Sequence, residues 1–151
     1  KIHGYNGDNA ATFAAGKVSD EAKRLCDTTK ESLYKGIEAA VAGGRLGDVG
    51  HAVQSYCEDR GYGVVREYTG HGVGTKLHED PSVPNFGTPG RGVRLLPGMV
   101  IAIEPMINEG TAAIKQMPDG WTVKTKDGKL SAHFEHTVAI TANGPLILTQ
   151  A

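Results

Sequence analysis

The hydrophobic pattern of the chain changes once, near Gly63, and this change limits the folds that the chain can adopt. Before Gly63, apolar residues recur at the spacing of an amphipathic helix. The pattern predicts one helix over residues 19–42, capped by Ser19, and a second over residues 48–59, capped by Asp48. Two helices so close in sequence form a hairpin.

After the change, the apolar residues come in short runs rich in β-branched and aromatic side chains, which are typical of strands. Asp127–Gly128 and Asn143–Gly144 tolerate positive φ, so we expect the last three strands to form an antiparallel meander. Three prolines between residues 81 and 89 predict a loop there. The sequence therefore predicts an α+β fold with these strands: 64–68, 99–107, 121–124, 132–141 and 146–149.

Length and composition exclude several classes of protein. A chain of 151 residues with 39% apolar content is expected to form a single domain. A net charge of -1 provides no field that would attract nucleic acid or an anionic membrane, and no apolar run is long enough to span a bilayer. Cys26 and Cys57 lack a paired framework, which predicts free thiols and a cytoplasmic location.

Four ionisable residues stand at strand ends or in glycine-rich turns: Asp8 in NGDNAATF, His71 in TGHGVG, Glu104 in IAIEPMIN and Glu135 in AHFEHTVAI. Glu104 and Glu135 follow or interrupt apolar strands, where an unpaired charge would cost several kcal/mol, roughly. Strand alternation puts His133 on the same face as Glu135. Arginine could neutralise either glutamate, but four such sites together favour a divalent metal.

Oxygen ligands with one imidazole suit Mn, Fe, Co or Zn, and carboxylates can bridge two such ions, which suggests a dinuclear hydrolase. The glycine-rich stretch at 70–74 lacks the spacing of a nucleotide-binding loop. His78–Glu79 does not continue into a zinc-protease helix, because Ser82 replaces the second histidine and Pro81 would break the helix.

Four separated blocks, NGDNAATF, YTGHGVG with LHEDP, PGMVIAIEPMIN and DGWTVKTKDGKLSAHFEHT, resemble type I methionine aminopeptidases along essentially the whole chain. The resemblance implies the pita-bread fold, of which this chain is mostly the C-terminal half: two helices packed on a curved antiparallel sheet. It implies a metallo-exopeptidase, a hydrolase that removes the N-terminal methionine from nascent polypeptides during protein maturation.

The resemblance also implies roles for individual residues. Asp8 and Glu135 match carboxylates that bridge two divalent ions, and His71 and Glu104 match the remaining ligands of one ion. Glu104 also matches a proton relay, and His78 matches a catalytic histidine that contacts the scissile amide. Substrate-binding positions are matched by His78 and, in the methionine pocket, by Trp121 and Leu77, where Leu77 replaces an aromatic residue. Glycines 70, 72 and 74 would let the backbone crowd the ions and turn sharply.

One departure concerns the second ion. The family has another aspartate eleven residues before the position of Asp8, which falls before Lys1. We therefore expect residues 1–151 to be a single, N-terminally truncated catalytic domain with one complete ion site. The expected partners are nascent polypeptides and, transiently, the ribosome, and the intact enzyme is expected to be a monomer. Two alternatives stay open: a non-catalytic metal-binding or partner-binding module, and a prolidase-like Xaa-Pro peptidase.

Overall fold

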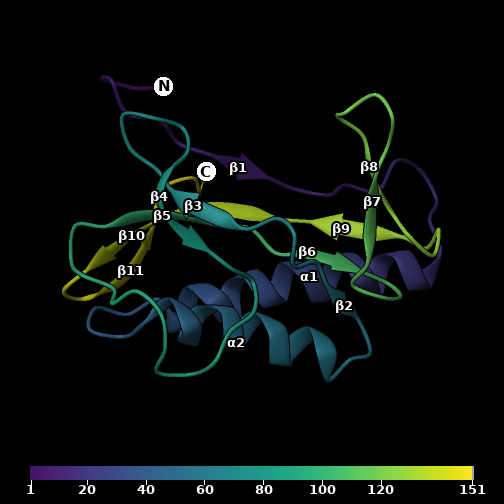
Figure 1. Ribbon diagram of the computed structural model, residues 1–151, viewed down its shortest axis with the longest axis horizontal. Helices are drawn as coiled ribbons and strands as arrows, with labels where there is room; N and C mark the ends of the chain where they lie inside the picture. The colour runs from purple at the N-terminus through teal and green to yellow at the C-terminus, as the bar shows by residue number, and fades with distance from the viewer. Residues whose placement is uncertain (151) are drawn as a thin grey trace.

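The computed structural model describes residues 1–150 and places two helices under one face of a curved antiparallel sheet (Figure 1). Helix α1 spans Asp20–Ala39, and the Ser19 hydroxyl accepts a hydrogen bond from the backbone N–H of Ala22 at 3.2 Å. The predicted cap is therefore confirmed. The helix ends three residues earlier than predicted, because the backbone of Ala40 leaves the helical conformation.

Helix α2 spans Leu46–Glu58 and begins two residues before the predicted start. The N-cap residue is Arg45 and not Asp48, but Asp48 does take part in the cap, as the third residue of a capping box. Asp48 lies in the first turn, where its carboxylate accepts the backbone N–H groups of Arg45 at 2.8 Å and Gly90 at 2.6 Å. The carboxylate thus accepts a backbone N–H at the start of the helix, and it also binds a loop that is distant in sequence.

Within residues 1–150, all paired strands are antiparallel and form three sheets. The six-stranded sheet has the order β1-β10-β5-β3-β4, with β11 paired to β10: β1 Asn9–Ala10, β3 Gly70–Gly72, β4 Glu79–Val83, β5 Val100–Ile103, β10 Glu135–Thr141 and β11 Gly144–Ile147. The three-stranded sheet has the order β2-β6-β9: β2 Gly63–Val64, β6 Met106–Asn108 and β9 Ser131–His133. A separate hairpin joins β7, Ile114–Gln116, to β8, Val123–Thr125.

Two predicted strands are each divided in two. The run 99–107 breaks between Ile103 and Met106, and the run 132–141 breaks at Phe134. Ile103 pairs with His136 and Met106 pairs with His133, so both breaks fall at the same level of the ladder. The pair of strands therefore passes from the larger sheet into the smaller one at this level.

Two other strand predictions differ from the structure. The meander is confirmed for β10 and β11, where Gly144 has a φ of 114°, but β8 pairs with β7 instead of joining it. The proline-containing stretch was predicted to be a loop, yet Glu79–Val83 forms β4. This strand pairs with β3 alone at the sheet edge, where Pro81 can be accommodated because a missing N–H need not break a ladder.

The main core lies between the two helices and the six-stranded sheet. Gly36 of α1 allows the close approach of these layers, since a Cβ there would lie 2.8 Å from Val53 of α2 and 3.3 Å from Ile103 of β5. Cys57 is buried in a smaller cluster, and both cysteines are free, as predicted. Neither helix in residues 1–150 is long and apolar enough to cross a membrane. The main cluster contains Leu33, Ile37, Ala40, Leu46, Val49, Val83, Leu95, Ile101, Ile103, Val138 and Ile140.

Candidate metal centre

The four residues predicted to bind metal converge at the level where the two sheets meet. Asp8 immediately precedes β1, His71 lies in β3, Glu104 follows β5 and Glu135 opens β10. The Nε2 atom of His71 is 3.4 Å from Glu104 Oε1 and 3.7 Å from Asp8 Oδ2. One potential ligand atom from each of His71, Glu104 and Glu135 lies within 4.8 Å of the other two. Residues separated by more than 120 positions therefore share one small volume.

Asp8 is held by its backbone. Its N–H donates to the Thr137 hydroxyl at 2.8 Å, and that hydroxyl donates to the Asp8 carbonyl at 2.7 Å. Two residues later, Ala10 of β1 pairs with Glu135 of β10. These contacts fix the Asp8 carboxylate beside Glu135 although β1 is only two residues long.

The glycines around His71 serve close packing. A Cβ at Gly70 would lie 2.2 Å from the carbonyl oxygen of Ala102, and one at Gly72 would lie 2.2 Å from that of Asp80. Neighbouring strands therefore approach β3 more closely than any side chain would allow. The chain does reverse direction just after Gly74, between the antiparallel strands β3 and β4, but none of Gly70, Gly72 and Gly74 needs positive φ for this.

The hydrogen bond of His71 leaves one of its ring nitrogens available to a ligand. Its Nδ1 lies 3.0 Å from the carbonyl oxygen of Gly72, which can only accept, so Nδ1 carries the proton. In the neutral ring Nε2 then directs a lone pair toward the carboxylates of Asp8 and Glu104. Burial, followed by the negative charges of Glu104 and Asp8, raises the pKa of Glu135 from 4.5 to about 8.

A divalent cation fits this arrangement. Within residues 1–150, no lysine or arginine nitrogen lies within 4.0 Å of the carboxylates of Asp8, Glu104 or Glu135. The arginine partner that could have neutralised the glutamates is thus not found. Three carboxylates and one imidazole lone pair would repel one another without a positive charge, and they are the donors that Mn, Fe, Co and Zn accept.

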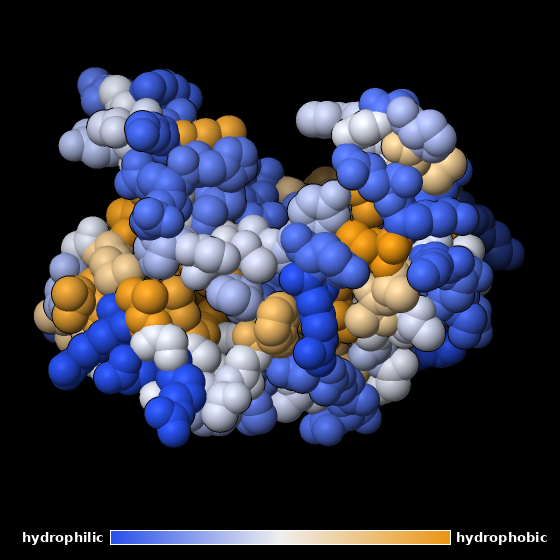
Figure 2. Space-filling model, viewed as in Figure 1, coloured by the Kyte–Doolittle hydropathy of each residue, from blue (hydrophilic) through white to orange (hydrophobic). Residues whose placement is uncertain are grey.

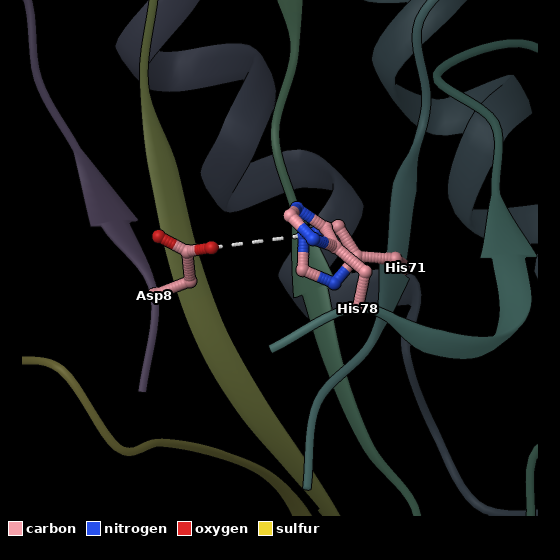
Figure 3. Close-up of side chains that lie close together, drawn as sticks. All are labelled: Asp8, His71 and His78. Atoms are coloured by element: carbon pink, nitrogen blue, oxygen red, sulfur yellow. Dashed lines mark ion pairs between the residues drawn. The ribbon is translucent and has the colours of Figure 1, made fainter. Parts of the chain in front are cut away.

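His78 lies beside this cluster, in the segment between β3 and β4. Its ring centroid is 4.2 Å from that of His71, with the ring planes at 65°. Figure 3 shows both imidazoles facing the Asp8 carboxylate across a gap. Potential ligand atoms of Asp8, His71 and His78 also lie within 4.8 Å of one another, a grouping that the sequence did not predict.

His133 was not predicted as a site residue, although alternation placed it on the same face as Glu135. Its Nε2 lies 3.4 Å from Glu104 Oε2 and is buried with no hydrogen-bond partner. His136 points the other way, toward α1, where its ring centroid is 6.0 Å from that of Tyr34. The predicted alternation is therefore confirmed, and it was the signal that could have identified His133.

The surface is hollowed between two projections (Figure 2). One consists of the N-terminus and the segment between β3 and β4, and the other is the β7–β8 hairpin (Figure 1). Leu77 belongs to the first and is 42% exposed, and Trp121 belongs to the second and is 87% exposed. A cavity of about 500 Å³ lies beside His71, and a more apolar cavity of about 390 Å³ lies beside His133. Neither cavity is lined by Leu77 or Trp121.

A partly buried cluster of carboxylates and imidazole, at a junction of sheets and open to a surface hollow, is a candidate divalent-metal centre of the kind found in metal-dependent hydrolases. Residues 1–142 match Metallopeptidase family M24. The chain belongs to this family.

Relatives agree with this assignment. The chain is 57% identical over 148 residues to a methionine aminopeptidase from Clostridium acetobutylicum, covering 98% of this chain and 59% of that protein. The crystal structure of a methionine aminopeptidase from Thermotoga maritima superposes with a TM-score of 0.96 and 50% identity, covering 99% of this chain and 60% of that chain. An Xaa-Pro dipeptidase from Bacillus anthracis gives a TM-score of 0.75 at 25% identity, with 98% and 36% covered.

These likenesses confirm the predicted fold class, the α+β pita-bread fold with two helices on a curved antiparallel sheet. The chain spans about three fifths of the length of the methionine aminopeptidases that it matches.

Proposed function

We propose that this chain carries the metal centre of an aminopeptidase that hydrolyses the first peptide bond of nascent polypeptides and releases their N-terminal methionine. The proposal rests above all on one observation: three carboxylates and one imidazole converge with no lysine or arginine partner among the described residues. The high identity to methionine aminopeptidases supports the choice of substrate. The reaction would take place in the cytoplasm, as a step of protein maturation.

Asp8, His71, Glu104 and Glu135 would hold divalent metal, with two ions in the intact site. When bound, a divalent ion supplies Lewis acidity, which polarises a carbonyl and lowers the pKa of water. Glu104 would accept a proton on its carboxylate and pass it to the leaving amine. The exposed His78 would donate a ring N–H to the oxygen on which charge develops.

The hollow between the two projections would receive the peptide, with Leu77 and Trp121 contacting the methionine side chain from opposite sides. The Trp121 side chain is 87% exposed, so it would pack against the bound substrate and form part of the pocket. In this proposal residues 1–151 act as one catalytic domain of a monomer that meets its substrates transiently at the ribosome.

The proposal can be tested on the purified chain. Calorimetric titration with Mn²⁺ or Co²⁺ gives the number of ions bound, and mass spectrometry of Met-Ala-Ser incubated with the loaded protein detects free methionine. We expect both ion binding and methionine release to be lost in Glu135→Gln. Both should be retained in the matched control Glu38→Gln, since Glu38 is exposed on α1 and pairs only with Lys35 at 2.9 Å.

The same experiment separates the alternatives. Ion binding without methionine release would favour a metal-binding module. This outcome is tested because the chain spans only 59% of the length of the related methionine aminopeptidase. Faster cleavage of an Xaa-Pro dipeptide than of Met-Ala-Ser would favour a prolidase-like peptidase, whose fold is also similar. Failure of Mn²⁺ and Co²⁺ to bind would count against both peptidases and the metal-binding module, and it would favour the partner-binding module.

A further inference from the structure

Two sets of potential metal ligands overlap at His71. The inner set is His71, Glu104 and Glu135, and its members are buried or half-buried. The outer set is Asp8, His71 and His78, and it includes the exposed ring of His78 (Figure 3). The outer set borders the cavity of about 500 Å³ that His71 and His78 help to line. An ion in solution can therefore reach the outer set directly.

His71 can serve only one set at a time. Its Nδ1 is engaged with the carbonyl oxygen of Gly72 at 3.0 Å, which leaves Nε2 as the one ring nitrogen with a free lone pair. One lone pair binds one ion. An ion held by the outer set thus removes the only imidazole of the inner set, and it also engages Asp8, 3.7 Å from the same nitrogen.

The two sets differ in ligand chemistry. The inner set offers one nitrogen and two carboxylates, whereas the outer set offers two nitrogens and one carboxylate. Carboxylate-rich sites suit Mn²⁺, while imidazole suits Zn²⁺. Three protein ligands of the His–His–carboxylate type are a common basis for Zn²⁺ binding, with a further position left to solvent.

We propose that the outer set is a second metal site, selective for Zn²⁺, whose occupation excludes Mn²⁺ from the inner set. The inference concerns ion binding and goes beyond the proposed peptidase activity. It makes the chain a selector between ions, in which His78 is a ligand of the outer ion. Zn²⁺ at the outer set and Mn²⁺ at the inner set would exclude one another, because each needs the Nε2 atom of His71.

The test uses the whole chain and two matched variants. His78→Gln changes only the outer set, and Glu104→Gln changes only the inner set. Zn²⁺ affinity is measured by calorimetry, and Mn²⁺ affinity by the electron paramagnetic resonance signal of the free ion. The ring nitrogens of His78 in the unaltered chain are followed by ¹⁵N NMR as one equivalent of Zn²⁺ is added.

We expect His78→Gln to weaken Zn²⁺ binding at least tenfold and to change Mn²⁺ affinity less than twofold, and Glu104→Gln to show the reverse pattern. In the unaltered chain, one equivalent of Zn²⁺ should shift a ring nitrogen of His78 and weaken Mn²⁺ binding at least tenfold. Equal Zn²⁺ affinity in His78→Gln and the unaltered chain, or an unmoved His78 resonance, would overturn the inference. The NMR measurement uses the unaltered chain, so it does not depend on the folding of any variant. If the unaltered chain binds Zn²⁺ through His78 but does not bind Mn²⁺, the result counts against the proposed function and not against this inference.

Discussion

Replacing Glu135 with glutamine is expected to stabilise the metal-free chain above neutral pH and to leave its stability unchanged in acid. Glu135 is 4% exposed, and its pKa in the folded chain is about 8, against 4.5 in a freely solvated carboxyl group. Below pH 4.5 the group is protonated in both the folded and the unfolded chain. As the pH rises from 4.5 to 8, only the unfolded chain releases the proton, so the free energy of unfolding falls.

The loss amounts to about 1.4 kcal/mol for each pH unit between the two pKa values, and is complete above pH 8 at on the order of 5 kcal/mol. Glutamine has nearly the shape of the protonated acid and does not ionise, so the variant avoids the loss. The difference is large against a typical domain stability of roughly 5–15 kcal/mol. Added divalent metal should narrow the difference above pH 8, because only the unaltered site gains about 2.7 kcal/mol at an ion concentration of 100 times Kd.

Urea unfolding of both proteins, followed by circular dichroism with a chelator between pH 4.5 and 9, measures the effect. Glu38→Gln serves as the control, since this exposed residue should follow the unaltered chain at every pH. Parallel curves for Glu135→Gln and the unaltered chain across this range would show that the buried carboxyl titrates like an exposed one. The reasoning from burial and neighbouring carboxylates would then be wrong.

Three further predictions follow from local packing. Gly70→Ala should lower the free energy of unfolding by about 2–4 kcal/mol in urea, because the new Cβ would lie 2.2 Å from the Ala102 carbonyl oxygen; an unchanged midpoint would contradict this. Burial raises the pKa of the Cys57 thiol to about 11, so a maleimide should label the half-buried Cys26 in the native chain and Cys57 only after unfolding. Trp121, at 87% exposure, should emit like free tryptophan and be quenched readily by acrylamide, and a blue-shifted, protected emission would be the contrary result.

The helices were largely predictable because hydrophobic period and the Ser19 cap act over a few residues. Strand pairing was less so. The sequence of β4 reads as a loop because Pro81 disfavours a ladder, and nothing local indicates that this strand lies at an edge. Likewise, the pairing of β8 with β7 depends on a partner for which no strand was predicted.

The convergence of the candidate ligands was anticipated because Glu104 and Glu135 close or open apolar strands, and because motif resemblance singled out Asp8 and His71. Alternation indicated that His133 shares a face with Glu135, but the approach of His133 to Glu104 also requires the register of two strands that are distant in sequence. The roles of the candidate ligands in metal binding remain predictions, which titration with Mn²⁺ or Co²⁺ would test.

The aligned breaks in the paired strands have a consequence for how this chain can vary. Ile103 is matched to His136 and Met106 to His133, so inserting or deleting one residue on one side alone would shift every partner beyond it and turn the carboxylate away. Changes of length there would have to occur in both strands together. The turn between β7 and β8, residues 117–122, lies outside these paired strands, so its length can change while the acidic centre stays fixed.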